Sequence, residues 1–164
     1  MLNARQYSIL DGMRRSDCPI AATLDLIGDR WTLVVLRDIL LVHRYGFSEI
    51  AANEGIATNI KADRLDRLVA AGLLERRVDG TDRRRRTYLP TERAIGLIPV
   101  LVDLLIWGTA HTGATSKADA AEAARADRDA VIRDLESAAR ENAAAASDEQ
   151  VCALLQSAHR QTGQ

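Results

Sequence analysis

The fold is decided by residues 73–89, which read LLERRVDGTDRRRRTYL. Residues 73–78 can form a strand, Asp79-Gly80 is a strong turn signal, and 85–89 can return as the antiparallel partner. The segment 76–86 carries six arginines against two aspartates, a local charge of +4. The pattern predicts a β-hairpin with a positively charged tip.

Helical periodicity precedes this hairpin and follows it. Apolar residues three and four positions apart predict four helices before it, over 19–27, 30–41, 49–53 and 58–71. Pro19 suits the first position of a helix, Gly28 suits its stop, and Asp29 and Ser48 suit the caps of the next two helices. After the hairpin, Pro90 and Thr91 open one long apolar helix that reaches about His111. This order predicts a mainly α fold with a small β-hairpin wing, a winged helix-turn-helix.

The last 51 residues have a different composition, since 16 of them are alanine. Two narrow apolar stripes run through them, one of Val131, Leu135 and Ala138 and one of Val151, Leu154, Leu155 and Ala158. Helices with so little apolar surface must dock on another surface, and the alternative is a partly frayed tail. We therefore divide the chain into an N-terminal arm (1–17), a winged domain (18–113) and a helical C-terminal extension (114–164).

Composition excludes several classes of protein. The chain is 47% hydrophobic and 27% charged, with 22 Lys and Arg against 23 Asp and Glu, so it is neither disordered throughout nor a histone-like polycation. No apolar run approaches the roughly 20 residues of a membrane span, and the N-terminus does not resemble a signal peptide. Two cysteines and three scattered histidines give no disulfide scaffold and no zinc spacing. We expect a cytoplasmic protein without a metal or cofactor.

A series of motifs occurs in unbroken order between residues 17 and 111. They are Cys18-Pro-Ile, Leu26-Ile-Gly-Asp-Arg-Trp-Thr-Leu, Phe47-Ser-Glu-Ile, Gly55-Ile-Ala-Thr-Asn-Ile, Ala62-Asp-Arg-Leu, Ala71-Gly-Leu-Leu-Glu-Arg, Tyr88-Leu-Pro-Thr-Glu, Pro99-Val-Leu and Trp107-Gly. Together they resemble the HxlR-type bacterial transcriptional regulators. The resemblance implies a homodimeric winged-helix protein that binds DNA and controls nearby genes in response to a metabolite or chemical stress. The extension lies outside it.

The helix over about 58–71 is the predicted recognition helix, whose first turn and outward face would meet base edges. Its candidate DNA contacts are Thr58, Asn59, Lys61, Ala62, Asp63, Arg64 and Arg67. Asn59 can bond adenine bidentately, or it can be a first-turn residue without a base contact. Asp63 and Arg67 can also simply pair along the helix. Because this helix has little net charge, phosphate neutralisation falls largely to the wing, about 76–89, with Arg83, Arg84, Arg85 and Arg86.

At Lys61 the sequence differs from the family that it resembles, which usually has Leu at this position. It precedes Leu65 and Leu68 by four and seven residues, so it belongs to the inner stripe of its helix. We expect its stem to lie at the edge of the core with the ammonium directed outward, or reaching a phosphate.

The last apolar helix has more apolar circumference than one small core covers, so we expect it to form a homodimer. The candidate contacts are Leu97, Leu101, Leu104, Leu105 and Trp107. The alternative places this helix wholly in the core of its own domain. A two-fold dimer requires an inverted-repeat operator with half-sites about one helical turn, or a multiple of it, apart.

Cys18 is the candidate sensor. As the N-cap of a helix it would lie where the helix dipole favours a thiolate, with Arg14 and Arg15 a few residues away. In the resembling family, some members sense oxidants or electrophiles at this Cys-Pro position. The alternatives are a small buried hydrophobic residue and a disulfide to Cys152, which requires the extension to fold back.

The sequence therefore predicts a regulator that binds double-stranded DNA as a homodimer. We expect repression because it is usual in the family that the sequence resembles. Oxidation of Cys18 or a small-molecule effector would modulate it. An enzyme using Cys18 with His43 or His111 would lack an oxyanion motif and a phosphate-binding loop, so we expect none. The second alternative is a winged helix used only for protein contacts, against which the four adjacent arginines argue.

Overall fold

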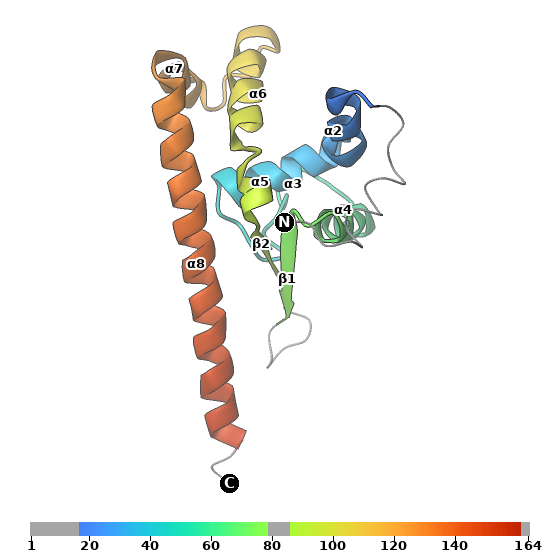
Figure 1. Cartoon of the computed structure of the whole chain (residues 1–164), viewed down its shortest axis with the longest axis vertical. Helices are drawn as coiled ribbons and strands as arrows, with labels where there is room; N and C mark the ends of the chain where they lie inside the picture. Colours follow the sequence, from blue (N-terminus) through green and yellow to red (C-terminus); the bar gives the residue numbers. More distant parts are fainter. Residues whose placement is uncertain (1–16, 79–85, 162–164) are drawn as a thin grey trace.

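The computed structural model describes residues 17–78 and 86–161, with side chains as far as Ser147. Its elements are α2 (Pro19–Ile27), α3 (Arg30–Leu41), α4 (Thr58–Ala70), β1 (Leu74–Val78), β2 (Arg86–Pro90), α5 (Glu92–Ile95), α6 (Ile98–His111), α7 (Ala118–Ala126) and α8 (Arg128–Gln161). Figure 1 shows α2 to α6 gathered in one body, with the long α8 alongside.

The order of the elements confirms the winged helix-turn-helix. The predicted hairpin forms, with β1 and β2 antiparallel and paired from Leu74 opposite Pro90 to Val78 opposite Arg86. Asp29 caps α3 as expected, since its side chain accepts hydrogen bonds from the amides of Trp31 at 3.0 Å and Thr32 at 3.2 Å. The wing therefore follows α4 directly and lies beside it.

The expected short helix over 49–53 is wrong, because this segment is a series of turns. The amides of Glu49 and Ile50 both donate to the carbonyl of Gly46, at 3.0 and 3.1 Å. Ala51 then has a positive φ of 52°, a left-handed conformation that no helix continues through. The Glu49 carboxylate accepts from the Gly46 amide at 3.1 Å, so Glu49 stabilises the start of the segment where Ser48 was expected to.

The expected single helix from Thr91 to His111 is also wrong, since it is broken into α5 and α6 at Gly96 and Leu97. The Thr91 side chain caps α5. Pro99 explains the break, because it has no amide to donate to the carbonyl four residues earlier and its ring clashes there. In the first turn of α6 the same residue is well tolerated.

The expectation that no apolar stretch is long enough for a membrane span is wrong by length and composition. Glu92–His111 has 20 residues and contains an 18-residue window with a mean hydropathy of 1.7, enough to pass such a test. The same segment supplies five residues to the core of the domain, namely Ala94, Ile95, Ile98, Leu101 and Val102. We therefore assign it to the folded domain.

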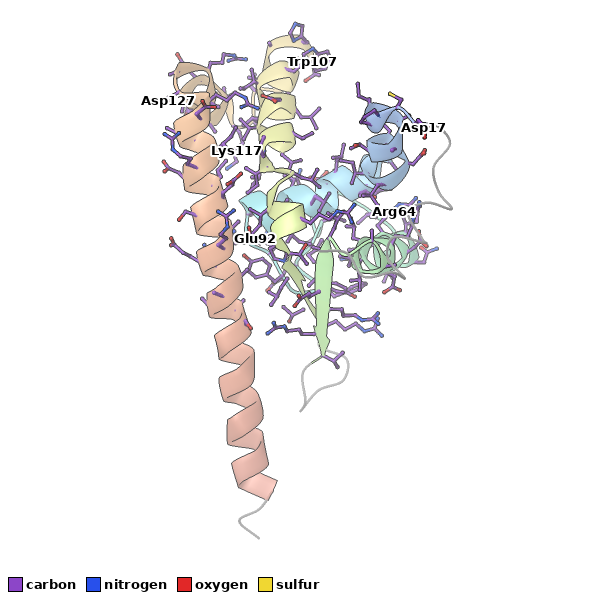
Figure 2. The ribbon with its side chains drawn as sticks, in the orientation of Figure 1. Asp17, Arg64, Glu92, Trp107, Lys117 and Asp127 are labelled. Atoms are coloured by element: carbon purple, nitrogen blue, oxygen red, sulfur yellow. The ribbon has the colours of Figure 1, made fainter. Side chains whose placement is uncertain are left out.

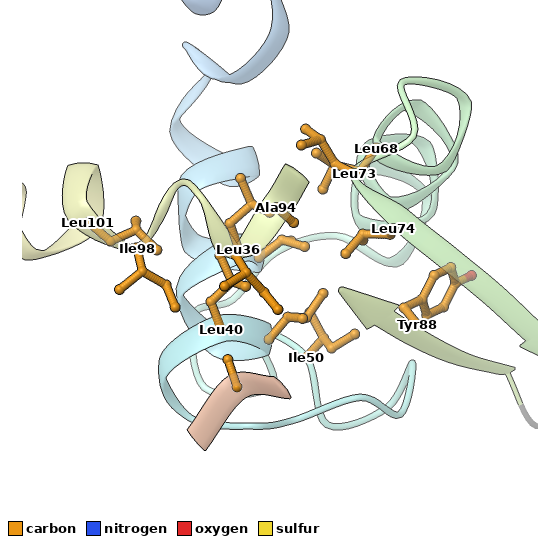
Figure 3. Packing of buried hydrophobic residues seen from close by; sticks show 14 of the residues in the cluster. Leu36, Leu40, Ile50, Leu68, Leu73, Leu74, Tyr88, Ala94, Ile98 and Leu101 are labelled. Carbon is orange, nitrogen blue, oxygen red and sulfur yellow. The ribbon is translucent and has the colours of Figure 1, made fainter. Parts of the chain in front are cut away.

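The core is a mainly aliphatic cluster around α3 (Figure 3). Its fully buried members come from α3, the turn segment, α4, the wing and α6, and include Leu36, Leu40, Ile50, Leu65, Leu68, Leu73, Tyr88 and Ile98. Full burial of each such side chain stabilises the fold by roughly 1.5–3 kcal/mol. The cluster fixes α4 and the wing on one framework.

The C-terminal extension docks on this framework as far as its side chains are described. Ile132 and Ala139 of α8 belong to the buried cluster, and Val131 and Leu135 pack against it. Arg128 also forms a bidentate ion pair with Asp103 of α6, both distances being 2.7 Å. In α7, and in α8 as far as Ser147, the extension is therefore helical and packed rather than frayed.

Candidate nucleic-acid interface

The first turn of α4 presents polar side chains to solvent. Thr58 and Asn59 are exposed, Ala62 is half-buried, and Leu65 and Leu68 face the core. Ala57 occupies the N-cap and has no side chain that can accept from the helix amides. The unsatisfied amides at this end favour anionic groups, as do those of helices that bind phosphate.

Arg64 is turned toward α3 and away from the outward face of α4 (Figure 2). Its Nε donates to Oδ1 of Asp29 at 2.8 Å, and its guanidinium also bonds Asp63. Burial would raise the pKa of the Asp29 carboxyl, but hydrogen bonds from Thr32 and Arg64 outweigh it and lower that pKa. Asp29 thus caps α3 and anchors α4 through one carboxylate.

Lys61 lies inside the domain, and the expectation that its ammonium points outward is wrong. Its residue exposure is 7%, and Nζ donates to the carbonyl of Ile50 at 3.0 Å. The same nitrogen lies 4.7 Å from the centre of the Phe47 ring, within the range of a cation–π contact. Burial lowers the pKa of Lys61. In this arrangement the side chain ties α4 to the preceding turn segment and does not reach a phosphate.

Arg67 is the cation that α4 leaves exposed. It forms no ion pair with any residue in the described part of the chain, so its expected pairing with Asp63 does not occur there. Asp63 pairs with Arg64, and Asp66 accepts from Arg76 of β1 at 2.8 Å. The outward face of α4 therefore has little positive charge.

In the described part of the wing, two adjacent arginines of β1 contact two different helices, α4 and α8. Arg76 meets Asp66 of α4, whereas Arg77 bonds Ser147 of α8 and lies 3.6 Å from Glu75. Alternation along a strand explains why adjacent residues face opposite sides. Arg86 opens β2 and is exposed. Arg83, Arg84 and Arg85 lie outside the described residues.

A buried carboxylate that the sequence analysis missed supports the turn segment. Asp38 is 1% exposed, and its Oδ2 accepts from the amide of Ala51 at 2.9 Å. The guanidiniums of Arg37 and Arg44 neutralise it at 2.6 and 3.4 Å. A carboxylate next to Ile39 on the apolar side of a predicted helix was the signal that could have identified it.

Two helices expose apolar side chains. Ile20 and Leu24 of α2 are exposed, as are Val100, Leu104 and Trp107 of α6, the last of them by 58%. Among the expected dimer contacts, Leu104 and Trp107 are therefore exposed, whereas Leu97 and Leu105 are half-buried. Leu101 is buried in the core of its own domain, which leaves it no surface for a partner. Only 28% of the apolar 18-residue window within Glu92–His111 is buried within the chain.

Cys18 is the N-cap of α2, as expected, and it is exposed rather than a small buried hydrophobic residue. Arg14, Arg15 and the side chain of Cys152 lie outside the described part of the structure. In the described ranges, no three His, Cys, Asp or Glu side chains come together as they would around a metal ion.

Known proteins share the winged part of the chain. Residues 26–116, more than half of its length, match the family model of HxlR-like helix-turn-helix proteins. An uncharacterized HTH-type transcriptional regulator of Mycobacterium tuberculosis is 37% identical over 90 residues, which cover 54% of this chain and 56% of that protein. Another from Halalkalibacterium halodurans is 30% identical over 93 residues, 56% of this chain and 82% of that protein.

A solved structure supports the same fold. The crystal structure of a candidate transcription factor matches with a TM-score of 0.54 and 32% identity, covering 61% of this chain and 69% of that one. The chain spans little more than half the length of the mycobacterial relative, and α8 lies beyond the family match.

Proposed function

The chain belongs to the HxlR-like helix-turn-helix family, and from that premise we propose that it is a transcriptional regulator that binds double-stranded DNA. The observation that carries the proposal is that α4 exposes a polar first turn while the wing packs against the same helix, with Arg76 bonded to Asp66. A recognition helix needs an open polar first turn, and a wing beside it can contact the adjacent backbone.

The two elements would divide the work. Thr58 and Asn59 are the candidates for base contacts in the major groove, where Asn can bond adenine bidentately. Arg67 is the exposed cation of α4, so most phosphate neutralisation falls to Arg86 and the arginines 83–85 of the wing. Sequence preference would then depend on α4 and affinity on the wing.

We further propose that the protein acts as a homodimer through the exposed apolar faces of α2 and α6. Burying Leu104 and Trp107 against a second copy would remove large apolar side chains from water. Because each is only about half exposed, the favourable change is about half that of a full burial, roughly 1 kcal/mol each. Two-fold symmetry then calls for an inverted-repeat operator with half-sites about one helical turn, or a multiple of it, apart. Repression is the expected outcome of such binding near a promoter.

Sedimentation tests the dimer. Leu104→Glu combined with Trp107→Glu should give monomers, because each subunit would bring carboxylates into an apolar interface. Val42→Glu is the matched control, since Val42 is equally exposed (45%, as is Leu104) but lies at the end of α3. If the doubly substituted protein remains a dimer while the control becomes a monomer, the interface does not lie on α6 and the proposed dimer surface is wrong.

The first experiment on DNA measures binding to the promoter region of the gene itself, across a range of salt concentrations. We expect affinity to fall steeply with salt, as for complexes held by phosphate contacts. Replacing Arg83–Arg86 by serine should abolish binding, whereas the alternative of a wing used only for protein contacts leaves any binding unchanged. No binding at any salt concentration would refute the regulator proposal for that promoter.

The effector is tested in the same assay. Diamide should weaken DNA binding of the wild type and not of Cys18→Ser if oxidation of Cys18 is the signal, for which its exposed position at the N-cap of α2 is the support. A complex indifferent to oxidant would direct the search to small-molecule effectors.

A further inference from the structure

The C-terminal helix α8 is the longest element and lies outside the family match. It contacts the winged domain at three levels along its length. Arg128 bonds Asp103 of α6, Arg140 bonds Glu92 at the start of α5 at 3.0 and 3.1 Å, and Ser147 bonds Arg77 of β1. Figure 2 shows Glu92 on the side of the domain that faces α8. The helix thus connects α6 to the wing.

Apolar packing fixes α8 between these polar contacts. Ile132 and Ala139 are buried in the common core, and Ala146 packs against it. From Arg128 to Ser147 the helix covers about 28 Å, given a rise of 1.5 Å per residue. A docked helix of this length is a stiff element, and it packs against α3, α5, α6 and β2 together.

The wing is held from both faces at its described base. Arg76 of β1 bonds Asp66 of α4 on one side, and Arg77 bonds Ser147 of α8 on the other. A two-stranded hairpin by itself is marginally stable in water, so its orientation depends on such supports. A wing already fixed in place also loses less conformational freedom when it binds a ligand.

We propose that α8 is a strut that positions the wing for contact with DNA phosphates, with Arg140 and Ser147 as positioning residues. The inference rests on the proposed DNA-binding function. It also links the wing to α6, because Asp103 and Arg128 fasten the other end of the strut to the helix whose exposed face is the proposed dimer surface.

Two variants release the strut to different degrees. Ala139→Glu places a carboxylate in the core and should undock α8, and Ala144→Glu is its control because Ala144 is exposed on the same helix. Arg140→Gln with Ser147→Ala removes two polar contacts without disturbing the core. Its control is Arg133→Gln with Ser137→Ala, two exposed residues of α8 without described contacts to other elements. All four full-length proteins are compared with the wild type.

The readouts are hydrogen exchange of the β1 and β2 amides without DNA, and promoter affinity as a function of salt. Undocking should speed exchange in the wing at least tenfold. It should also make the slope of log K against log salt shallower by about 0.9 for each phosphate that the wing no longer neutralises. For each lost phosphate contact, a variant that matches the wild type at 1 M salt should bind about eightfold more weakly than the wild type at 0.1 M salt. A variant that is merely less stable would keep the slope of the wild type.

The outcomes separate this inference from the function on which it rests. Faster wing exchange together with a shallower slope in both released variants, and in neither control, supports the strut. Unchanged exchange and slope in both released variants overturn it. If the wild type binds no promoter DNA at any salt concentration, the proposed function fails, and wing exchange alone then decides whether α8 holds the wing.

Discussion

Two arginines of α4, three residues apart, should respond oppositely to the same substitution. Arg64 points inward to Asp29, whereas Arg67 is exposed and has no ion pair with a described residue. We therefore compare Arg64→Gln with Arg67→Gln. Each substitution removes one positive charge from α4 and introduces glutamine, whose helix propensity is similar to that of arginine.

The structure sets the size of each effect. The Arg64–Asp29 pair is partly exposed, with side-chain exposures of 22% and 33%, so its loss should lower the free energy of unfolding by only about 1 kcal/mol. Asp29 still caps α3 through Trp31 and Thr32. Because a domain is typically stable by about 5–15 kcal/mol, Arg64→Gln remains folded. Its DNA complex should keep the salt slope of the wild type.

Arg67→Gln should leave stability unchanged within about 0.5 kcal/mol, as expected for an exposed position. If Arg67 contacts a phosphate, the slope of log K against log salt becomes shallower by about 0.9. If the two proteins bind equally at 1 M salt, the variant complex is about eightfold weaker than the wild-type complex at 0.1 M salt.

The assay combines urea unfolding with fluorescence anisotropy of labelled promoter DNA at five or more salt concentrations. We expect lower stability with an unchanged slope for Arg64→Gln, and unchanged stability with a shallower slope for Arg67→Gln. A shallower slope with unchanged stability for Arg64→Gln would refute the assignment of Arg64 to Asp29, because Arg64 would then leave Asp29 and contact the DNA.

Three further substitutions test the interior. Lys61→Met should lower the free energy of unfolding by about 1–2 kcal/mol at pH 7, because the Ile50 carbonyl loses its donor. Since the pKa of Lys61 is lowered in the folded state, the stability of the wild type relative to this variant should rise as the pH increases toward 10.5 in urea unfolding. Asp38→Asn should lower the free energy of unfolding by about 3 kcal/mol in the same measurement, because it removes a buried carboxylate that accepts from the buried Ala51 amide and pairs with the partly exposed Arg37 and Arg44. Burial raises the pKa of Tyr45 to about 12, so wild-type stability should fall between pH 10 and 12, whereas Tyr45→Phe should not show that loss.

The sequence was sufficient where local rules decide the structure. The cap at Asp29, the N-cap position of Cys18 and the antiparallel pairing of two strands that are close in the chain depend on local sequence. The expected turn at Asp79-Gly80 lies outside the described residues. The break before α6 could also have been predicted, because Pro99 cannot sit in the interior of a helix that begins at Glu92. Apolar periodicity alone does not contain this constraint, which is why it predicts a single helix.

The direction of charged side chains could not be predicted in the same way. Arg64 meets Asp29, 35 positions away, and Lys61 meets the carbonyl of Ile50 in a turn whose geometry depends on the positive φ of Ala51. Helical periodicity places Lys61 correctly on the inner stripe. It does not reveal that the Ile50 carbonyl and the Phe47 ring lie beside the ammonium group. Without these two partners the ammonium group would have to face water.

These internal partners reduce the positive charge that α4 exposes on its outward face. Its formal charges include two arginines and a lysine, but Lys61 is buried and Arg64 is occupied by Asp29. Arg67 is left beside Asp63 and Asp66, so the outward face of α4 cannot attract a polyanion strongly. A DNA-binding role for this chain therefore requires the wing to supply most of the positive charge, and an element that fixes the wing becomes as important to affinity as the recognition helix is to sequence preference.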